Sequence, residues 1–302
     1  MDFTQLLSAM PGAVAQGLIW GVMAIGVFIT YKVLDIADLT VDGSIATGGA
    51  TCVMLTIAGL PVWLAMVCAL AAGLLAGLVT GLLHTLMGIP ALLAGILTQL
   101  SLYSINLRIL GASNQSINVL KYDLLVSLRY ITHAILVVAV FAVVIIALLY
   151  WFFGTELGCS IRATGANPNM SRAQGINVNF TKVLGLMLSN GLVALSGALL
   201  AQYQGFADVK MGIGSIVIGL AAVIIGDVLF SRIFHNFALK LLSVVLGAVI
   251  YYAVLQVVFS FGISSDYLKL LTAVIVAIFL AVPYWKAKYF SKPGKKGGKT
   301  NA

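Results

Sequence analysis

The chain has 302 residues, of which 61% are hydrophobic and 9% charged, and its mean hydropathy is +1.09. Soluble domains carry roughly a quarter charged residues, so this composition excludes a soluble globular protein and places most of the chain in a bilayer. The formal net charge is +8, and the last seventeen residues hold six lysines: Lys286, Lys288, Lys292, Lys295, Lys296 and Lys299. We expect this basic tail, residues 286–302, to lie on a cytoplasmic membrane surface with anionic lipid, and not to bind nucleic acid.

Apolar runs of about twenty residues recur along the chain, and each is long enough to cross about 30 Å of hydrocarbon. The pattern predicts nine transmembrane helices: 11–31, 43–59, 62–86, 90–106, 133–153, 183–203, 213–230, 240–262 and 267–284. The second, fourth and seventh are short or interrupted by glycine, so we expect broken or re-entrant helices there. The predicted fold is therefore all-α, a multi-pass membrane domain over residues 1–285 followed by the basic tail.

The basic residues predict an orientation, because lysine and arginine are enriched in short cytoplasmic loops. With the C-terminus inside, twelve are cytoplasmic: the six tail lysines, Lys32, Arg162, Arg172, Lys182, Arg232 and Lys240. Five are outside: Arg108, Lys121, Arg129, Lys210 and Lys269. The asymmetry depends on the tail, without which the count is six against five. Nine spans then place the N-terminus outside.

A short motif occurs twice, 171 residues apart. Gly43-Ser44-Ile45-x-x-Gly48-x-Ala50 recurs as Gly214-Ser215-Ile216-x-x-Gly219-x-Ala221, and each copy opens an apolar segment. At the same offset the first predicted span aligns with the sixth. The chain then divides into four spans (11–106), one linking span (133–153) and four further spans (183–284). An odd linker inverts the second half, and inverted repeats place a transport path at their interface. Chance similarity among small residues is the alternative.

Small residues also recur at helical spacing. Ala69, Gly73, Gly77 and Gly81 are four residues apart on the third segment, and Gly17 and Gly21 are four apart on the first. This spacing lets helix backbones approach closely in lipid. We favour packing within one bundle over a dimer seam.

Polar side chains inside the apolar part of the chain are candidates for a transport path, because a buried polar group in a bilayer needs a partner or water. The candidates are Asp38, Thr40, Asp42, Thr98, Gln99, Asn106, Ser189, Asn190 and Gln202. Interhelical hydrogen bonding is the alternative, and we favour it for the serines and threonines. Both interpretations stay open for Asn190, Gln99 and the acidic connection 35–42. We expect Asp227 to cap or pair at the cytoplasmic edge.

The connection 154–182 is polar, punctuated by glycine and cytoplasmic in the predicted orientation. Asn167-Pro168 is a helix-start signal with Pro168 suited to the first helical position, and Gly175 is suited to end a helix. We therefore predict a short helix over residues 168–174. Such a helix could dock in a groove of a cytoplasmic partner, and an ordinary solvated loop is the alternative.

The same connection carries the pattern Leu157-Gly158-x-x-x-Arg162-Ala163-x-Gly165-x-Asn167, followed by Ala173-x-Gly175-Ile176-Asn177. This pattern resembles the coupling loop of ABC importer permeases of the branched-chain amino acid and ribose type. The resemblance extends over nearly the whole chain and includes the stretches 38–43, 93–98 and 196–205. These stretches look like a branch of the family associated with tryptophan and tyrosine uptake.

The resemblance implies a permease subunit, without catalysis of its own, that forms the translocation path for a small solute in a bacterial cell membrane. The expected partners are a second permease copy or paired permease, a cytoplasmic ABC ATPase dimer and an extracytoplasmic substrate-binding protein, often a lipoprotein. The residues expected to engage the ATPase are Leu157, Gly158, Arg162, Ala163, Gly165, Asn167, Met170, Ala173, Gly175 and Ile176. The resemblance favours an amino acid as the solute. Among the classes of amino acid, it favours an aromatic one.

Two other classes of function remain as alternatives. An ion-coupled secondary transporter is also built from inverted repeats, and the acidic connection 35–42 is its candidate ion site. A membrane enzyme needs a nucleophile–base pair or a metal cluster, and we find no motif for either. Gly298-Lys299-Thr300 lacks the spacing of a P-loop. We therefore expect no nucleotide, metal or cofactor site in this chain.

Overall fold

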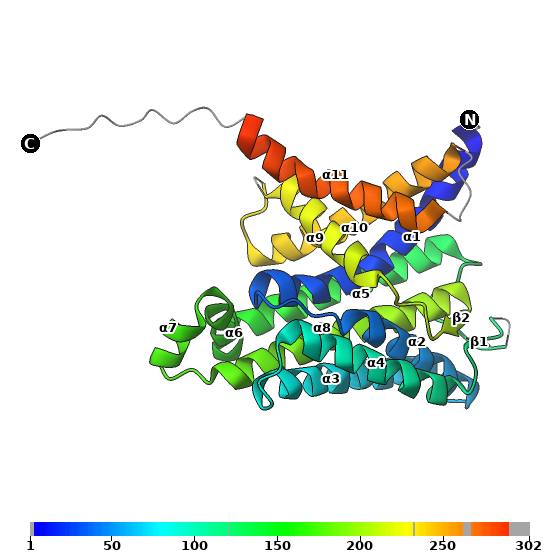
Figure 1. Cartoon of the computed structure of the whole chain (residues 1–302). Helices are drawn as coiled ribbons and strands as arrows, with labels where there is room; N and C mark the ends of the chain where they lie inside the picture. Colours follow the sequence, from blue (N-terminus) through cyan, green and yellow to red (C-terminus); the bar gives the residue numbers. More distant parts are fainter. Residues whose placement is uncertain (1–2, 120, 232, 262–266, 290–302) are drawn as a thin grey trace, which may run out of the picture.

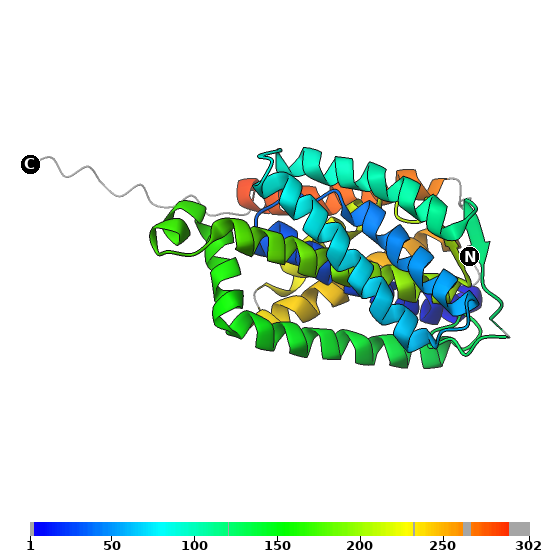
Figure 2. The same cartoon turned by 90° about the horizontal axis from the view of Figure 1, so that it is seen from below.

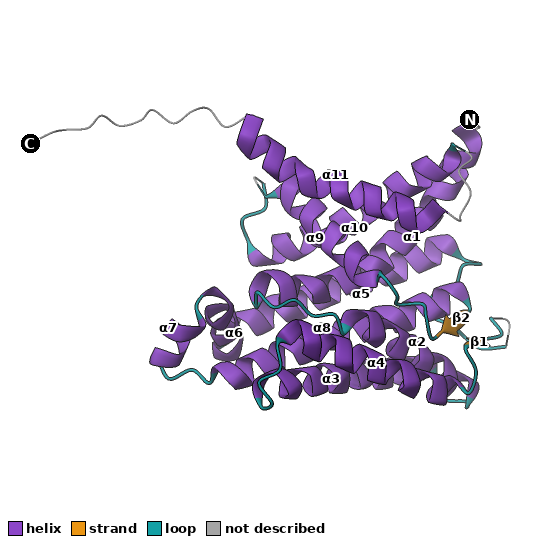
Figure 3. Ribbon diagram, in the orientation of Figure 1, coloured by secondary structure: helices purple, strands orange, loops and turns teal. Residues whose placement is uncertain are grey.

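A computed structural model describes residues 3–119, 121–231, 233–261 and 267–289. The described chain is nearly all helical, with one small pair of strands (Figures 1 and 3). The long elements are α1 (Phe3–Phe28), the π-helical turn η1 (Ile29–Val33), α2 (Val41–Ile57), α3 (Val62–Thr85), α4 (Ala91–Leu110), α5 (Ile131–Gly154), α8 (Val178–Gln204), α9 (Ser215–Phe230), α10 (Phe237–Ser260) and α11 (Leu268–Tyr289). The short ones are β1 (Asn114–Ser116), α6 (Glu156–Ala166), α7 (Pro168–Ala173) and β2 (Phe206–Asp208).

Among the described residues, six helices are long and apolar enough to cross a membrane: α1 with η1, α3, α4, α5, α8 and α10. This confirms a polytopic membrane protein. The 17-residue α2 and the 16-residue α9 are shorter, as expected for the second and seventh segments. For the fourth segment the expectation of a short or broken helix is wrong, because α4 continues for 20 residues to Leu110. There Gly111 adopts the left-handed conformation (φ 68°) that commonly ends a helix.

The bundle has two distinct ends (Figure 1). We call the end that carries α6 and α7 the coupling end and the opposite end the strand end. At the strand end β1 pairs antiparallel with β2, with Asn114 opposite Asp208. At the coupling end Lys32 forms an ion pair with Asp227 (3.1 Å), which confirms the pairing expected for Asp227. Arg232 and residues 290–302 of the predicted basic tail lie outside the described residues.

Helix α8 runs through the middle of the bundle (Figure 2) and is largely buried. The predicted small-residue ladder of α3 lies against it: a Cβ at Gly73 would meet the Asn190 carbonyl oxygen at 2.3 Å, and one at Gly77 would meet that of Leu186 at 2.3 Å. On α1 a Cβ at Gly17 would lie 2.7 Å from Val249 Cα in α10. These glycines therefore allow close helix packing inside one bundle, which confirms the interpretation favoured from the sequence.

Two non-helical segments lead into the two copies of the repeated motif. Residues 34–40 connect η1 to α2, and the turn 209–214 connects β2 to α9. Within the first, Asp35 takes a positive φ of 54°, which reverses the local direction of the chain. Each segment ends at one copy of the repeated motif, because Gly43 lies in the first turn of α2 and Gly214 is the N-cap of α9.

Candidate translocation and coupling sites

Asp38 and Asn190 meet in the core of the bundle, and both are fully or nearly fully buried. Asn190 Nδ2 donates to Asp38 Oδ2 (2.7 Å) and to the Leu186 carbonyl (3.0 Å), while Asn190 Oδ1 accepts from the Ser44 hydroxyl (2.6 Å). The other Asp38 oxygen accepts from the backbone N–H of Thr40 (2.9 Å). One amide on α8 therefore holds both the 34–40 segment and the start of α2, and the side chains of Asp38, Ser44 and Asn190 are all hydrogen-bonded here.

A chain of threonine hydroxyls joins three elements beside this pair. Thr40 Oγ1 lies 2.8 Å from Thr80 Oγ1, which donates to Thr98 Oγ1 at 2.9 Å. Thr40 precedes α2, Thr80 belongs to α3 and Thr98 to α4. Thr80 is a residue that the sequence analysis missed. A single hydroxyl amid an apolar run was its only signal.

Asp42 connects the two copies of the repeated motif. Its carboxylate accepts from Gly214 N (2.9 Å), Ser215 Oγ (2.8 Å) and Ile216 N (2.9 Å). These are the orphan donors at the N-terminus of α9, where a carboxylate is also stabilised by the helix dipole. A position in the first half of the chain therefore caps a helix of the second half.

The remaining path candidates lie apart from this cluster. Ser189 donates to the Gly26 carbonyl (2.8 Å), which joins α8 to α1. Gln202 lies near the strand end, where it accepts from Leu125 N (3.2 Å). Asn106 is buried with a long contact to the Gly43 carbonyl (3.5 Å), and Gln99 is half-buried on α4. The structure thus brings Asp38, Thr40, Thr98 and Asn190 together, and places Asp42 next to them in the chain.

The connection 154–182 forms two short helices at the coupling end. The predicted helix is present as α7, with Asn167 Oδ1 accepting from Asn169 N (3.1 Å) and Met170 N (3.0 Å). The sequence analysis missed α6, whose N-cap is Thr155. Threonine before glutamate is the capping signal that would have indicated it. The exposed residues of the expected coupling set are Leu157, Arg162, Asn167, Met170, Ala173 and Gly175.

Some members of the expected coupling set hold α6 against the bundle. Arg162 donates to the Phe153 carbonyl at the end of α5 (2.8 Å), and its guanidinium lies 5.8 Å from the Phe237 ring centroid in α10. A Cβ at Gly165 would meet the Val33 carbonyl oxygen at 1.8 Å, and one at Gly158 would meet that of Phe152 at 2.3 Å. Only glycine allows these backbones to approach so closely. Ala163 and Ile176 are half-buried.

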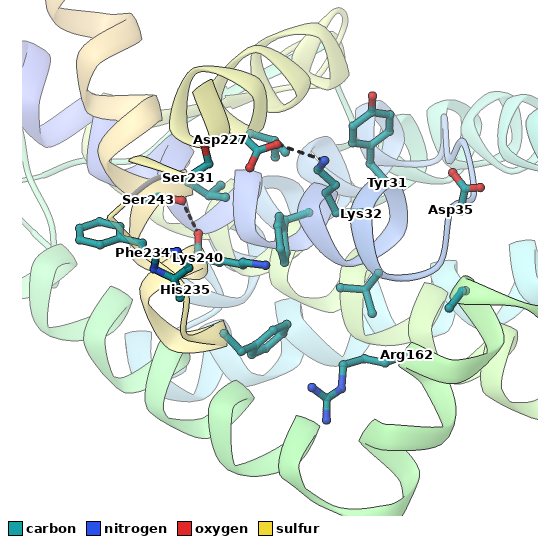
Figure 4. A pocket seen from close by; sticks show the side chains of 17 residues that line it. Tyr31, Lys32, Asp35, Arg162, Asp227, Ser231, Phe234, His235, Lys240 and Ser243 are labelled. Atoms are coloured by element: carbon teal, nitrogen blue, oxygen red, sulfur yellow. Dashed lines mark hydrogen bonds and ion pairs between the residues drawn. The ribbon is translucent and has the colours of Figure 1, made fainter. Parts of the chain in front are cut away.

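A cavity of about 740 Å³ opens beside Arg162 at the coupling end (Figure 4). It lies between η1, the last turn of α9, the start of α10 and α6, and the ion pair Lys32–Asp227 is part of its wall. Lys240, His235 and Asp35 add further charged or titratable groups. Among the described residues no group of three or more His, Cys, Asp or Glu side chains could hold a metal ion. The cavity therefore has several charged side chains in its wall and adjoins α6, which carries part of the expected coupling set.

Residues 10–283 match the protein family described as "Branched-chain amino acid transport system / permease component". The chain belongs to this family of transport permeases. It is 40% identical over 275 residues to the tyrosine transport system permease protein of Clostridioides difficile, with 91% of each chain covered. It is 28% identical to the D-allose transport system permease protein AlsC of Escherichia coli, with 78% of this chain and 71% of AlsC covered.

The fold of this permease is also that of a solved complex, PsaBC from Streptococcus pneumoniae bound to a Fab. The match has a TM-score of 0.54 and 17% identity, and it covers 94% of this permease and 99% of the solved chain. The family expected from the coupling-loop motif is therefore confirmed. The protein is a multi-pass permease of a transport system.

Proposed function

We propose that this permease forms the translocation path of an ATP-driven importer for an aromatic amino acid. The similarity to the tyrosine transport system permease protein supports this solute class, since it covers nine-tenths of both chains. The similarity to a D-allose permease shows that sugar permeases share this ancestry. Identity is higher, at 40% against 28%, to the tyrosine permease.

The observation that carries the mechanism is a continuous contact from the coupling end to the core. Helix α6 packs through Gly165 on the backbone of Val33, where the π-helical turn ends. The chain then enters the 34–40 segment, whose Asp38 is bonded to Asn190, and two residues after that segment Asp42 caps α9. A displacement of α6 would therefore be transmitted to the buried cluster through covalent chain and hydrogen bonds.

The partners in this scheme are a second permease copy or paired permease, an ATPase dimer and an extracytoplasmic binding protein. The exposed side chain of Met170 on α7 and that of Leu157 on α6 offer apolar contacts for a groove on the ATPase. Closure of the ATPase dimer on ATP would push α6 and α7, and the path would switch from outward to inward access.

We also propose nine membrane-crossing or half-crossing helices in two inverted halves, 11–106 and 183–284, linked by α5. The equal lengths of α3 and α10, 24 residues each, support this arrangement. So does the Asp42 contact between the two motif copies. The coupling end then faces the cytoplasm, with the C-terminus inside.

The decisive experiment is reconstitution of the permease in liposomes with its ATPase and binding protein. We expect uptake of labelled tyrosine that requires ATP and both partners. Uptake driven by an ion gradient with the permease alone would instead identify a secondary transporter, with the acidic connection 35–42 as its ion site.

Orientation is tested independently by a thiol at Asn169, which is exposed on α7. Cys159 is the exposed native thiol and is replaced by serine in this variant. In right-side-out vesicles we expect Asn169→Cys to react only with a membrane-permeant maleimide. Reaction with an impermeant maleimide from outside would contradict the coupling scheme.

A further inference from the structure

A second cavity, of about 260 Å³, lies in the strand-end half of the bundle between α1, α9, α10 and α11. It is separate from the coupling-end cavity and from the Asp38–Asn190 cluster. Ligand pockets for small molecules span roughly 300–1,000 Å³, and an apolar cavity of about 150 Å³ is enough for benzene. This cavity therefore has room for one aromatic ring with its substituents, and not for a large ligand.

The walls of the cavity are aromatic. Trp20 and Tyr252 lie with ring centroids 6.0 Å apart, and Tyr251 meets Tyr252 edge to face at 5.4 Å. Phe259 lines the same space from one α10 turn further on. Aromatic rings pack favourably in offset and edge-to-face arrangements at these distances. The aromatic ring of a ligand in this cavity could therefore pack against the wall residues in the same offset or edge-to-face arrangements.

Some polar groups in these walls have no hydrogen-bond partner among the described residues. The Trp20 side chain is 8% exposed, and its indole Nε1 has no hydrogen-bond acceptor among the described residues. The amides of Gln16 and Gln256 also line the cavity, and neither is bonded to another described residue. The Tyr251 hydroxyl, in contrast, donates to Thr272 Oγ1 (3.0 Å). An unpaired buried donor is costly in a bilayer, so the Trp20 indole indicates a ligand that accepts a hydrogen bond. The half-buried amides of Gln16 and Gln256 could bind the same ligand.

The lining contains no Asp, Glu, Lys, Arg or His. A zwitterion buried here would lack counter-charges, so the ammonium and carboxylate of an amino acid would stay at the mouth, where Ile213 is 55% exposed. The floor includes Ser215, whose hydroxyl is bonded to Asp42. The cavity therefore adjoins the contact that links the two halves of the chain.

We propose that this cavity is a binding site for the ring of an aromatic solute, with Trp20 and Gln256 as hydrogen-bonding partners of a ring substituent such as a phenol hydroxyl. The inference rests on the proposed importer function and names a site for its solute. The ring would occupy the cavity while the charged end of the solute remains in water on the strand-end side.

The test is equilibrium binding to the full-length permease in lipid nanodiscs, with p-cresol as the uncharged probe and toluene as the probe that lacks a hydroxyl. We expect p-cresol to bind more tightly than toluene. Trp20→Phe should weaken p-cresol binding by about five-fold, the loss of one hydrogen bond, and leave toluene binding unchanged. Trp63→Phe is the matched control, because Trp63 is 63% exposed on α3. It should bind both probes as the wild type does.

Gln256→Leu provides a second variant, since its half-buried side chain is replaced without opening a void. It should also weaken p-cresol binding selectively. Equal affinity for toluene and p-cresol, or unchanged p-cresol binding in both variants, would overturn the inference.

ATP-driven tyrosine uptake by the wild-type complex is measured in parallel. If the wild-type complex takes up tyrosine but Trp20→Phe and Gln256→Leu bind p-cresol as the wild type does, only the proposed binding site is refuted. If the complex takes up no tyrosine but the wild-type cavity still binds p-cresol selectively, only the proposed solute of the importer is refuted.

Discussion

The Asn190 side chain offers the sharpest test of how the core is held. Leucine has the same branching and number of side-chain heavy atoms, and this replacement removes three hydrogen bonds, to Asp38, Ser44 and Leu186. Interhelical hydrogen bonds in membrane proteins average about 0.6 kcal/mol. The buried Asp38 oxygen left without a donor adds roughly 1–3 kcal/mol. We therefore expect Asn190→Leu to lower the free energy of unfolding by about 3 kcal/mol.

Ser189→Ala is the matched control on the same helix. It removes one bond, from the Ser189 hydroxyl to the Gly26 carbonyl, and should cost about 0.6 kcal/mol. The assay is reversible unfolding of the full chain in mixed micelles, followed by far-UV circular dichroism. An equal loss of unfolding free energy in Asn190→Leu and Ser189→Ala would contradict the central role of the Asn190 hydrogen bonds in the core.

A double-mutant cycle separates the bond itself from general damage to the core. Asp38→Leu and Asn190→Leu together should cost at least about 1 kcal/mol less than the sum of the single variants, because neither partner is then left unpaired. Additive losses would show that the two side chains act independently, and the reasoning would fail.

Three further outcomes follow from the same contacts. Asp42→Ala should destabilise the protein by about 2 kcal/mol through loss of the α9 cap, whereas the exposed Asp123→Ala should leave the unfolding midpoint unchanged. Gly165→Leu should reduce ATP-driven uptake by at least about ten-fold in a folded permease, since its side chain would collide with the Val33 carbonyl. Leucine at the exposed neighbour Ala166 should be tolerated, and equal uptake in both would count against the contact. Met170→Glu should abolish co-purification of the ATPase without shifting the unfolding midpoint; retained co-purification would exclude α7 from the interface.

The sequence predicted the helices well because the bilayer imposes a length and an apolar composition on each span. Helices lie in all nine predicted segments, and six of the described helices are long and apolar enough to cross a membrane. The motif Asn167-Pro168 correctly located the start of α7. The small-residue ladders were also interpreted correctly, since only backbone approach requires them. The fourth segment was misjudged because Gly95 was taken as an interruption. In the structure Gly95 stays helical and lies against Leu39 N, where a Cβ would come within 2.8 Å.

The site was predictable only in its residue types. Sequence reasoning selected Asp38 and Asn190 as polar groups in an apolar setting, but their pairing spans 152 positions and no local pattern encodes it. Arg162 was selected as a contact for the ATPase, which stays a prediction; the structure adds that this exposed side chain also donates to the Phe153 carbonyl at the end of α5. The aromatic cavity was missed altogether, because Trp20 and Gln256 each look like ordinary residues of an apolar helix.

The sequence by itself determined a multi-pass permease with a two-copy motif and a short helix between α5 and α8, because hydropathy and helix signals act within a few turns of the chain. Only the tertiary structure decided which polar groups satisfy one another and which stay unpaired. Hydrogen bonds depend on distances of about 3 Å between atoms, and residues remote in sequence reach those distances only once the helices have packed.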